Sequence, residues 1–252
     1  MKNLLYKFTC FLLICFHYSS ASFAQSNAGP KLFRTAEARN TIQDSLKKQF
    51  EKQNLTWPPQ AIYLRSFKYE RQLEVWVKSD IKQPYKLLKT YKVCQQSGST
   101  GPKRVEGDYQ VPEGFYYINE FNPNSNYHLS LGLNYPNASD KILSDQSRPG
   151  SAIYIHGDCV STGCIPITDA PIEELYFLAS SVKTQGQEFI PVHVFPIRYN
   201  IKKSADFLQA SMKDNAYLQQ FNNNIKEMFD YFEVKKQLPV IMVNMKGEYV
   251  LN

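Results

Sequence analysis

The feature that most constrains the fold is a series of short segments in which apolar and polar residues alternate between clusters of turn-forming residues. Two prolines at 58–59 precede alternating runs at 61–67 and 72–78, and a Gly- and Ser-rich loop at 97–102 follows a third run. Alternation with a period of two is typical of strands. The aromatic content of 14% favours sheet as well. We therefore predict a β-rich α+β fold in a chain of 252 residues, which is long enough for one large domain or two small ones.

Helical patterns occur in three places. One helix is predicted over 35–53, where apolar residues recur at a four-residue spacing, and another begins at Asp169, a candidate cap. Residues 204–233 are mainly helical in pattern, and 238–251 predict a final hairpin. The polar, turn-rich stretch 134–150 predicts a loop. Further strands are predicted within 85–95, 115–133 and 189–195.

The first 24 residues have the composition of a secretory signal peptide. A basic start at 1–7 precedes a short apolar stretch at 8–16, and small residues within 22–24 precede Gln25. The apolar stretch is too short for a membrane span, which needs about 20 residues. We expect contact with the membrane only through this segment before its cleavage, and a mature chain that begins near Gln25 and works outside the cytoplasmic membrane.

The charge of the chain is mildly basic and dispersed. Cleavage after residue 24 removes Lys2 and Lys7 and no acidic residue, so the formal charge falls from +6 to +4. The lysines are spread along the sequence instead of forming a basic stripe. This pattern suits a polyanionic surface and does not indicate nucleic-acid binding.

The stretch 151–165 brings a base and a thiol close together in the sequence. His156 ends an apolar, strand-like segment, and a Ser-Thr-Gly-Cys turn follows that ends at Cys164. A free thiol with a pKa near 8.5 is mostly protonated at neutral pH unless an imidazole takes its proton. Cys164 is therefore a candidate nucleophile, and His156 is its candidate base. Gly163 allows close approach of the backbone, and the amides of this turn, including that of Cys164, are candidates for an oxyanion site.

The predicted mature chain has an odd number of cysteines, so at least one of them has no partner for a disulfide within the chain. Cleavage removes Cys10 and Cys15 and leaves Cys94, Cys159 and Cys164 in a compartment where disulfides persist. If Cys164 stays free as a nucleophile, Cys94 and Cys159 remain as a possible pair. The sequence leaves open whether their geometry permits a bridge.

The stretch around Cys164 resembles the signature of the YkuD-type L,D-transpeptidase catalytic domain, in which a catalytic His-Gly or His-Ser pair precedes a Ser-His-Gly-Cys motif. Residues 101–114 are similar to a second element of that family, which contains Gly-Pro, Gly-Asp and Pro-Glu-Gly steps. The short loop between His156 and Cys164 is similar to the YafK-like branch. Two ordered motifs make the resemblance more specific than one.

The resemblance implies a fold and a domain organisation. It covers about residues 57–200, which are expected to form the catalytic domain, a mixed β-sheet or sandwich core with N- and C-terminal helices. The signal peptide takes 1–24, and a lead-in with one helix takes 25–56. Residues 201–252 are expected to form a C-terminal helical extension and the final hairpin, packed on the same domain.

The resemblance also assigns roles to residues of the site. In the family a backbone carbonyl just after the catalytic histidine orients its ring, and the matching position here is Gly157. Ser161 matches the serine of the motif and is interpreted as a turn-stabilising or substrate-contacting hydroxyl. Thr162 replaces a second histidine of many members, and Pro166 stands where Arg or Asn often follows; these departures concern the acceptor more than the thiol chemistry. Candidate substrate-binding side chains are His128, Arg148 and Arg198.

The function implied by the resemblance is that of a bacterial enzyme of the periplasm or cell envelope that acts on peptidoglycan stem peptides. The Cys164 thiolate would form a thioester, which an amine resolves into a cross-link and water resolves as a carboxypeptidase or amidase. The YafK-like branch is associated with hydrolysis that releases wall-attached protein. No cofactor is implied, because thiol acyl transfer needs none. The alternative is a non-catalytic peptidoglycan-binding module of the same fold, and the retained His156 and Cys164 argue against it.

Two other readings of the same residues fit less well. His156 and the three cysteines of the mature chain nominally supply four zinc ligands, but their spacing matches no common zinc pattern and the chain has no Cys-x-x-Cys pair, so no metal is expected. Papain-like and NlpC-type peptidases also use Cys and His. In those enzymes the cysteine comes first in the chain, whereas here His156 precedes Cys164.

Overall fold

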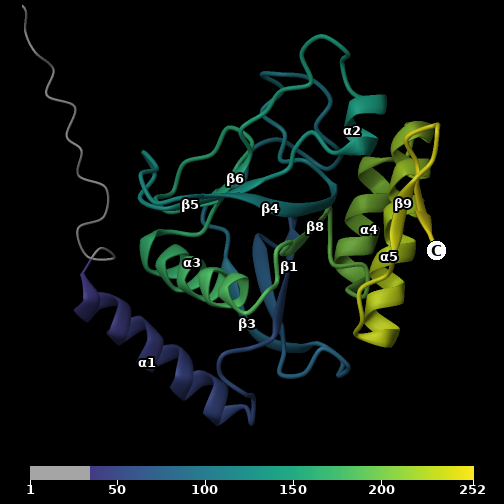
Figure 1. The fold of residues 1–252 in the computed structure, drawn as a ribbon. Helices are drawn as coiled ribbons and strands as arrows, with labels where there is room; N and C mark the ends of the chain where they lie inside the picture. Colours follow the sequence, from purple (N-terminus) through teal and green to yellow (C-terminus); the bar gives the residue numbers. More distant parts are fainter. Residues whose placement is uncertain (1–34) are drawn as a thin grey trace, which may run out of the picture.

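A curled sheet of eight strands forms the centre of the molecule (Figure 1). The structure is a computed structural model that describes residues 35–252, so the predicted signal peptide lies outside the described residues. The eight strands are β1 Ala61–Phe67, β2 Gln72–Lys78, β3 Lys86–Lys92, β4 Gly114–Asn122, β5 Ser130–Leu133, β6 Tyr154–His156, β7 Ile165–Pro166 and β8 Pro191–Phe195. They lie in the order β3-β2-β1-β8-β4-β5-β6-β7. The predicted β-rich α+β class is confirmed.

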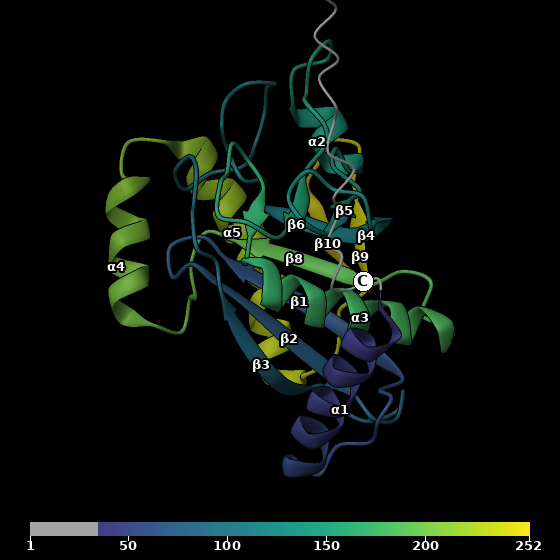
Figure 2. The ribbon, with the colours of Figure 1, turned by 90° about the vertical axis from the view of Figure 1, so that its left-hand side faces the viewer.

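The helices cover both faces of this sheet. They are α1 Ala36–Lys52, α2 Ala138–Leu143, α3 Asp169–Thr184, α4 Lys202–Ser211 and α5 Ala216–Lys235, and a separate hairpin consists of β9 Ile241–Val243 and β10 Tyr249–Leu251. Helices α1 and α3 lie together on one side, while α4, α5 and the hairpin lie on the other (Figures 1 and 2). Within residues 35–252, no helix has the length and apolar character that crossing a bilayer requires.

Most predicted elements form where their local signals lie. Thr35 accepts a hydrogen bond from the Ala38 amide at 3.1 Å and so caps α1, as predicted. The predicted hairpins β1–β2 and β9–β10 both form. The prediction of an irregular loop over 134–150 is wrong for six residues, because Asn137 and Asp140 form a capping box that starts α2. The helical region predicted over 204–233 is interrupted where Asn215 caps a new helix, α5.

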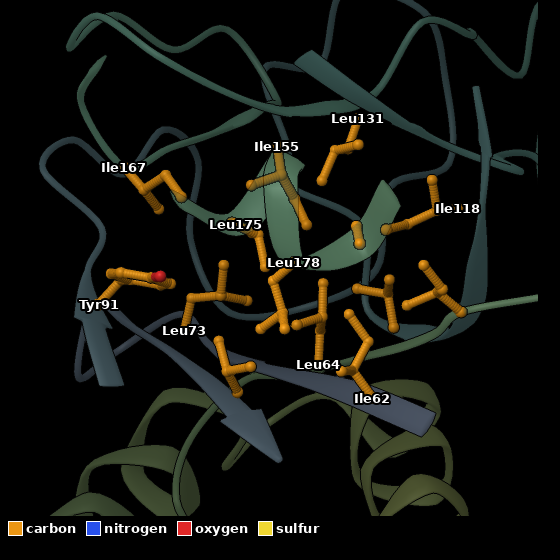
Figure 3. Packing of buried hydrophobic residues seen from close by; sticks show 14 of the residues in the cluster. Ile62, Leu64, Leu73, Tyr91, Ile118, Leu131, Ile155, Ile167, Leu175 and Leu178 are labelled. Carbon is orange, nitrogen blue, oxygen red and sulfur yellow. The ribbon is translucent and has the colours of Figure 1, made fainter. Parts of the chain in front are cut away.

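The main apolar core lies between the sheet and α3. Ile62 and Leu64 of β1 point toward Leu175 and Leu178 of α3, and all four side chains are fully buried (Figure 3). Because β1 is central, its other face is buried as well and packs against α5. This sandwiching fixes the position of the strands from which the loops of the site emerge.

The second face of β1 carries a buried ion-pair network. Arg65 is 1% exposed and pairs with Glu74 at 2.8 Å and with Glu233 of α5 at 2.6 Å. Four aromatic rings surround its guanidinium at about 5 Å: those of Phe67, Trp76, Phe229 and Phe232. A buried charge is costly unless groups of opposite charge and hydrogen-bonding partners compensate for its lost hydration. The network therefore joins the C-terminal helices to the sheet.

The curl of the sheet brings its two ends together. The Cys94 amide, just beyond β3, donates to the Pro166 carbonyl of β7 at 3.0 Å. A disulfide joins Cys94 to Cys159, with 5.7 Å between their Cα atoms. The loop that connects β6 to β7 is therefore tied at its middle to the opposite end of the same sheet.

Candidate active site

The base and the thiol of the sequence motif lie on neighbouring strands. His156 ends β6, and Cys164 immediately precedes β7. The two strands pair in parallel, with Ile155 opposite Ile165, so Cys164 lies next to Tyr154. Side chains two residues apart on a strand share a face. This register places Cys164 and His156 at diagonal positions on the same face of the paired strands.

The His156 ring is oriented by the residue that follows it. Its Nδ1 lies 2.6 Å from the Gly157 carbonyl oxygen. Because a carbonyl only accepts, Nδ1 carries the proton and Nε2 is the free nitrogen that can act as a base. The ring is buried and lies against the Tyr127 ring, with 4.8 Å between centroids. The carbonyl that the family resemblance assigns to this role is therefore the one that accepts this proton.

The pKa directions of both groups favour their uncharged forms at neutral pH. Burial lowers the pKa of His156 below its ordinary value, although the Gly157 carbonyl and Asp158 oppose this effect. Burial also raises the pKa of the Cys164 thiol, although the Tyr154 amide and the Lys103 ammonium oppose it. The thiol donates instead to the Ala152 carbonyl at 3.6 Å. The two pKa directions thus favour loss of the Cys164 proton during attack on a substrate over a preformed ion pair.

The turn before Cys164 is held by Ser161. Its hydroxyl donates to the Cys164 carbonyl at 2.8 Å and accepts from the Gly163 amide at 3.2 Å. Gly163 has φ +133°, and a Cβ at this position would lie 3.1 Å from the Gln110 carbonyl oxygen. Ser161 therefore stabilises the turn, and Gly163 allows it to lie close to the wall formed by the upstream motif.

That upstream motif folds around Asp108. Its carboxylate accepts hydrogen bonds from the backbone amides of Arg104, Val105 and Gln110 and pairs with Lys103 Nζ at 2.5 Å. Burial acts to raise its pKa, but Lys103 and these amides outweigh that effect and lower it. The folded loop and the Cys164 turn enclose a cavity of about 390 Å³, and Cys164 and Thr162 are among its lining residues. The cavity offers room for a substrate beside the thiol.

Comparisons with known proteins identify the family of the chain. Residues 69–194 match the model of the YkuD family, described as the L,D-transpeptidase catalytic domain. The chain is also 35% identical over 205 residues to "Putative L,D-transpeptidase YafK" of Escherichia coli strain K12, and the match covers 80% of this chain and 77% of that protein. The chain belongs to the YkuD family.

The chain is also similar to solved structures of lower sequence identity. The helical cell shape determining protein Pgp2 of Campylobacter jejuni is 20% identical, with a TM-score of 0.44 and coverage of 73% of each chain. L,D-transpeptidase 1 of Mycobacterium tuberculosis is 16% identical, with a TM-score of 0.30 and coverage of 53% of this chain and 61% of that one.

Two of the three predicted substrate-binding side chains of this YkuD domain have other partners. Arg198 donates to Glu74 and to Gln72 and lies over the Phe67 ring, 4.4 Å from its centroid. This corrects the prediction that its guanidinium is available to a substrate carboxylate. His128 is also reassigned, because its Nε2 lies 2.7 Å from Glu173 Oε1, in the packing behind Gly157.

The remaining predicted residues are an exposed arginine and three cysteines. Arg148 is exposed, and its backbone carbonyl accepts from Glu106, which lines the cavity, so its contact with substrate stays a prediction. Cys94 and Cys159 are bonded to each other, and Cys164 is the free cysteine of residues 35–252. Within the same range, no group of three or more His, Cys, Asp or Glu side chains is arranged to hold a metal ion.

The sequence did not assign a role in the site to four residues that lie there in the structure. Lys103 lies inside a motif that the resemblance identified, but its neighbours in the sequence give no sign that its ammonium acts on the Cys164 thiol. Tyr127 sits on the edge of a predicted loop. The sequence predicts Asp169 as a helix cap and gives Glu173 no role. Only the tertiary fold brings these segments next to His156 and Cys164.

The direction of the His156 pKa predicts the pH dependence of activity. A general base must be unprotonated, and the pKa of His156 lies below its ordinary value of 6.5 because the ring is buried. We expect the acid limb of kcat/KM to have its midpoint below pH 6.5, with activity lost as the pH falls through that midpoint. Measurement of kcat/KM for a stem-peptide substrate from pH 4.5 to 9 checks this, and an acid limb centred above pH 6.5 would contradict it.

Substitution of Gly157 tests the packing that orients the ring. A Cβ at Gly157 would lie 2.6 Å from Asp169 Oδ1 and 2.8 Å from both the Tyr127 carbonyl oxygen and the His128 Cβ. We expect Gly157→Ala to lower kcat about tenfold and the free energy of unfolding by about 1–3 kcal/mol. Gly186→Ala is the control for kcat, because its Cβ would meet nothing within 4 Å; its φ of +101° disfavours alanine, so a loss of stability is expected there without a loss of turnover. Kinetics and urea unfolding measure both effects; wild-type kcat in Gly157→Ala would show that the ring is held in another way.

Proposed function

We propose that the chain is a secreted enzyme of the bacterial cell envelope that acts on peptidoglycan stem peptides through a thioacyl-enzyme on Cys164. The observation that carries this proposal is the state of His156. Its Nδ1 proton is held by the Gly157 carbonyl, which leaves Nε2 as the basic nitrogen. His156 ends β6, and Cys164, whose free thiol lines a cavity, immediately precedes the neighbouring strand β7. Family membership supports the same chemistry, since the matching model is that of the L,D-transpeptidase catalytic domain.

The first half of the proposed reaction forms a thioester. Cys164 Sγ attacks the carbonyl carbon of the L-centred third residue of the stem, usually a diamino acid, while its proton moves to His156 Nε2. The amide of Cys164 stabilises the oxyanion, because the Gly163 amide is already bound to Ser161. The C–N bond then breaks, and His156 returns the proton to the departing terminal D-alanine.

The second half resolves the thioester. An amine from another stem gives a cross-link, and water gives the carboxypeptidase or amidase outcome, which would release a wall-attached protein if such a protein is the leaving group. We favour the hydrolytic outcome for this chain, because the YafK-like branch that it resembles is associated with hydrolysis. In either case His156 deprotonates the incoming nucleophile.

The envelope location of the proposal rests on two features. The sequence 1–24 has the composition of a signal peptide. A disulfide between Cys94 and Cys159 suits an oxidising compartment such as the periplasm. The proposed substrate is found in the same compartment, so secretion and substrate support one another.

The test is to incubate the mature chain, residues 25–252, with purified tetrapeptide muropeptides and to analyse both partners by mass spectrometry. We expect loss of the terminal D-alanine and, after an acid quench, a mass increase on the peptide that contains Cys164. A cross-linked dimer indicates an amine acceptor, and a tripeptide product indicates water. Binding of muropeptides without turnover and without an adduct on Cys164 would overturn the proposed enzymatic activity and favour the non-catalytic binding module.

A further inference from the structure

The peptide bond that follows Gly157 is held from both of its ends. Its carbonyl oxygen accepts the His156 Nδ1 proton at 2.6 Å, and its N–H, which belongs to Asp158, donates to Asp169 Oδ1 at 2.7 Å. A peptide group is planar, so it cannot turn about its C–N bond to keep one of these hydrogen bonds and lose the other. The orientation of the imidazole is therefore coupled to the position of one carboxylate on α3.

We propose that Asp169 is a positioning residue for His156 and acts on it through the Gly157–Asp158 peptide group. In a catalytic triad a carboxylate binds the imidazole directly and fixes its tautomer. Here the same constraint passes through one peptide group, whose carbonyl faces the ring and whose amide faces the carboxylate. The inference rests on the proposed function in one respect, since it takes His156 as the base for Cys164.

Asp169 is placed for this role by the way α3 begins. It is the first residue of the helix, and the capping position before it, Thr168, makes no side-chain cap hydrogen bond. Thr168 has φ +70°, which is rare for a β-branched residue and indicates local strain. The sequence predicts that Asp169 caps its own helix. Its carboxylate instead reaches the loop after β6, where it accepts from the Asp158 amide.

Strained backbone recurs in the segments that meet at this point. His128 and Asp158 also have positive φ, +73° and +54°. The second oxygen of Asp169 lies 3.8 Å from His128 Nδ1, and the other ring nitrogen of His128 is held by Glu173. Strain of this kind persists only where the surroundings fix it, and it is common at functional sites. The three segments together hold the carboxylate against the Asp158 amide.

The other groups that face His156 do not replace Asp169. Asp158 raises the pKa of the ring by its charge, but its own Oδ1 accepts from the Cys159 amide at 2.6 Å. Tyr127 contacts the ring face, and Lys103 acts on the Cys164 thiol. The hydrogen bond from the Asp158 amide goes to Asp169, so the orientation of the peptide group depends on that carboxylate.

The experiment reads the tautomer of His156 directly by nitrogen NMR of the mature chain labelled in histidine. The mature chain has three histidines, and loss of one set of signals in His156→Gln assigns the ring. In the wild type we expect the proton on Nδ1. Asp169→Ala should give a mixture of tautomers, whereas Asp169→Asn should keep the proton on Nδ1, because its amide oxygen can accept from Asp158. Glu174→Gln is the matched control, since Glu174 lies on the same helix and pairs with Lys89.

Kinetics give an independent reading of the same variants. With muropeptide substrate we expect Asp169→Ala to lower kcat about tenfold with KM unchanged, and Asp169→Asn to keep at least about a third of the wild-type kcat. Asp169→Ser replaces the alanine variant if that variant does not fold, because serine suits a helix start but is too short to reach Asp158. A wild-type tautomer and kcat in the alanine or serine variant would overturn the proposal, as would Asp169→Asn behaving like Asp169→Ala. The tautomer needs no substrate, so inactivity of the wild type would count against the proposed function and leave the role of Asp169 to the NMR result.

Discussion

Replacement of Cys164 with alanine is expected to reduce the turnover of muropeptides at least about 10⁴-fold. Alanine has no atom that can attack a carbonyl carbon, and the remaining cysteines of the mature chain are joined to each other and cannot substitute. The fold should survive, because Cys164 is only partly buried and its hydrogen bond to the Ala152 carbonyl is long, at 3.6 Å. Product formation measured by chromatography, together with the unfolding midpoint in urea, checks both expectations.

A companion variant tests whether Cys164 and His156 act as one catalytic unit or contribute to turnover independently. His156→Gln should lose activity to a similar extent, and the double variant with Cys164→Ala should be no worse than either single one, because the two groups act as a unit. Gly186→Ala again supplies a variant that should leave turnover unchanged. Turnover by Cys164→Ala within tenfold of the wild type would rule out the thiol as nucleophile and with it the thioester.

The elements that the sequence predicted well are those in which the deciding interactions are local. The period of two over 61–78 already places the turn of the first hairpin, and Thr35 caps α1 through an amide three residues away. Helix α2 was missed because its six residues are too few to show an amphipathic period in a polar stretch. The break before α5 was missed for the opposite reason: Asn215 is a good cap, but the apolar pattern continues on both sides of it.

The charged residues show why the site was only partly predictable. His156 and Cys164 are linked by a short loop, so their pairing follows from spacing. Arg198 is predicted as a candidate ligand of a substrate carboxylate, and nothing near it in the sequence reveals Glu74, which lies 124 positions earlier. Asp169 and His128 are likewise brought to Gly157 only by the pairing of β5, β6 and β7 and the packing of α3. Contacts between such distant positions depend on the whole topology.

Removal of the disulfide is expected to have the largest effect on stability among the substitutions considered. The bond closes a loop with a sequence separation of 65, and constraint of the unfolded chain over such a length stabilises a protein by about 2–4 kcal/mol. We expect the double variant Cys94→Ser, Cys159→Ser to lose this amount of unfolding free energy. Urea unfolding of the mature chain at equilibrium measures it. The comparison belongs in a Cys164→Ala background, so that no free thiol can exchange with the bond.

Activity should respond less than stability to this change. The Cys94 amide still donates to the Pro166 carbonyl without the disulfide, so β7 keeps its connection to the end of β3, and Ser161 still holds the turn of Cys164. In the wild-type Cys164 background we therefore expect kcat to fall only about two- to fivefold at 25 °C. A reducing agent should destabilise the wild type to the level of the serine variant and leave that variant unchanged. Equal stability of the two proteins before reduction would show that the loop between His156 and Cys164 is fixed by its hydrogen bonds alone.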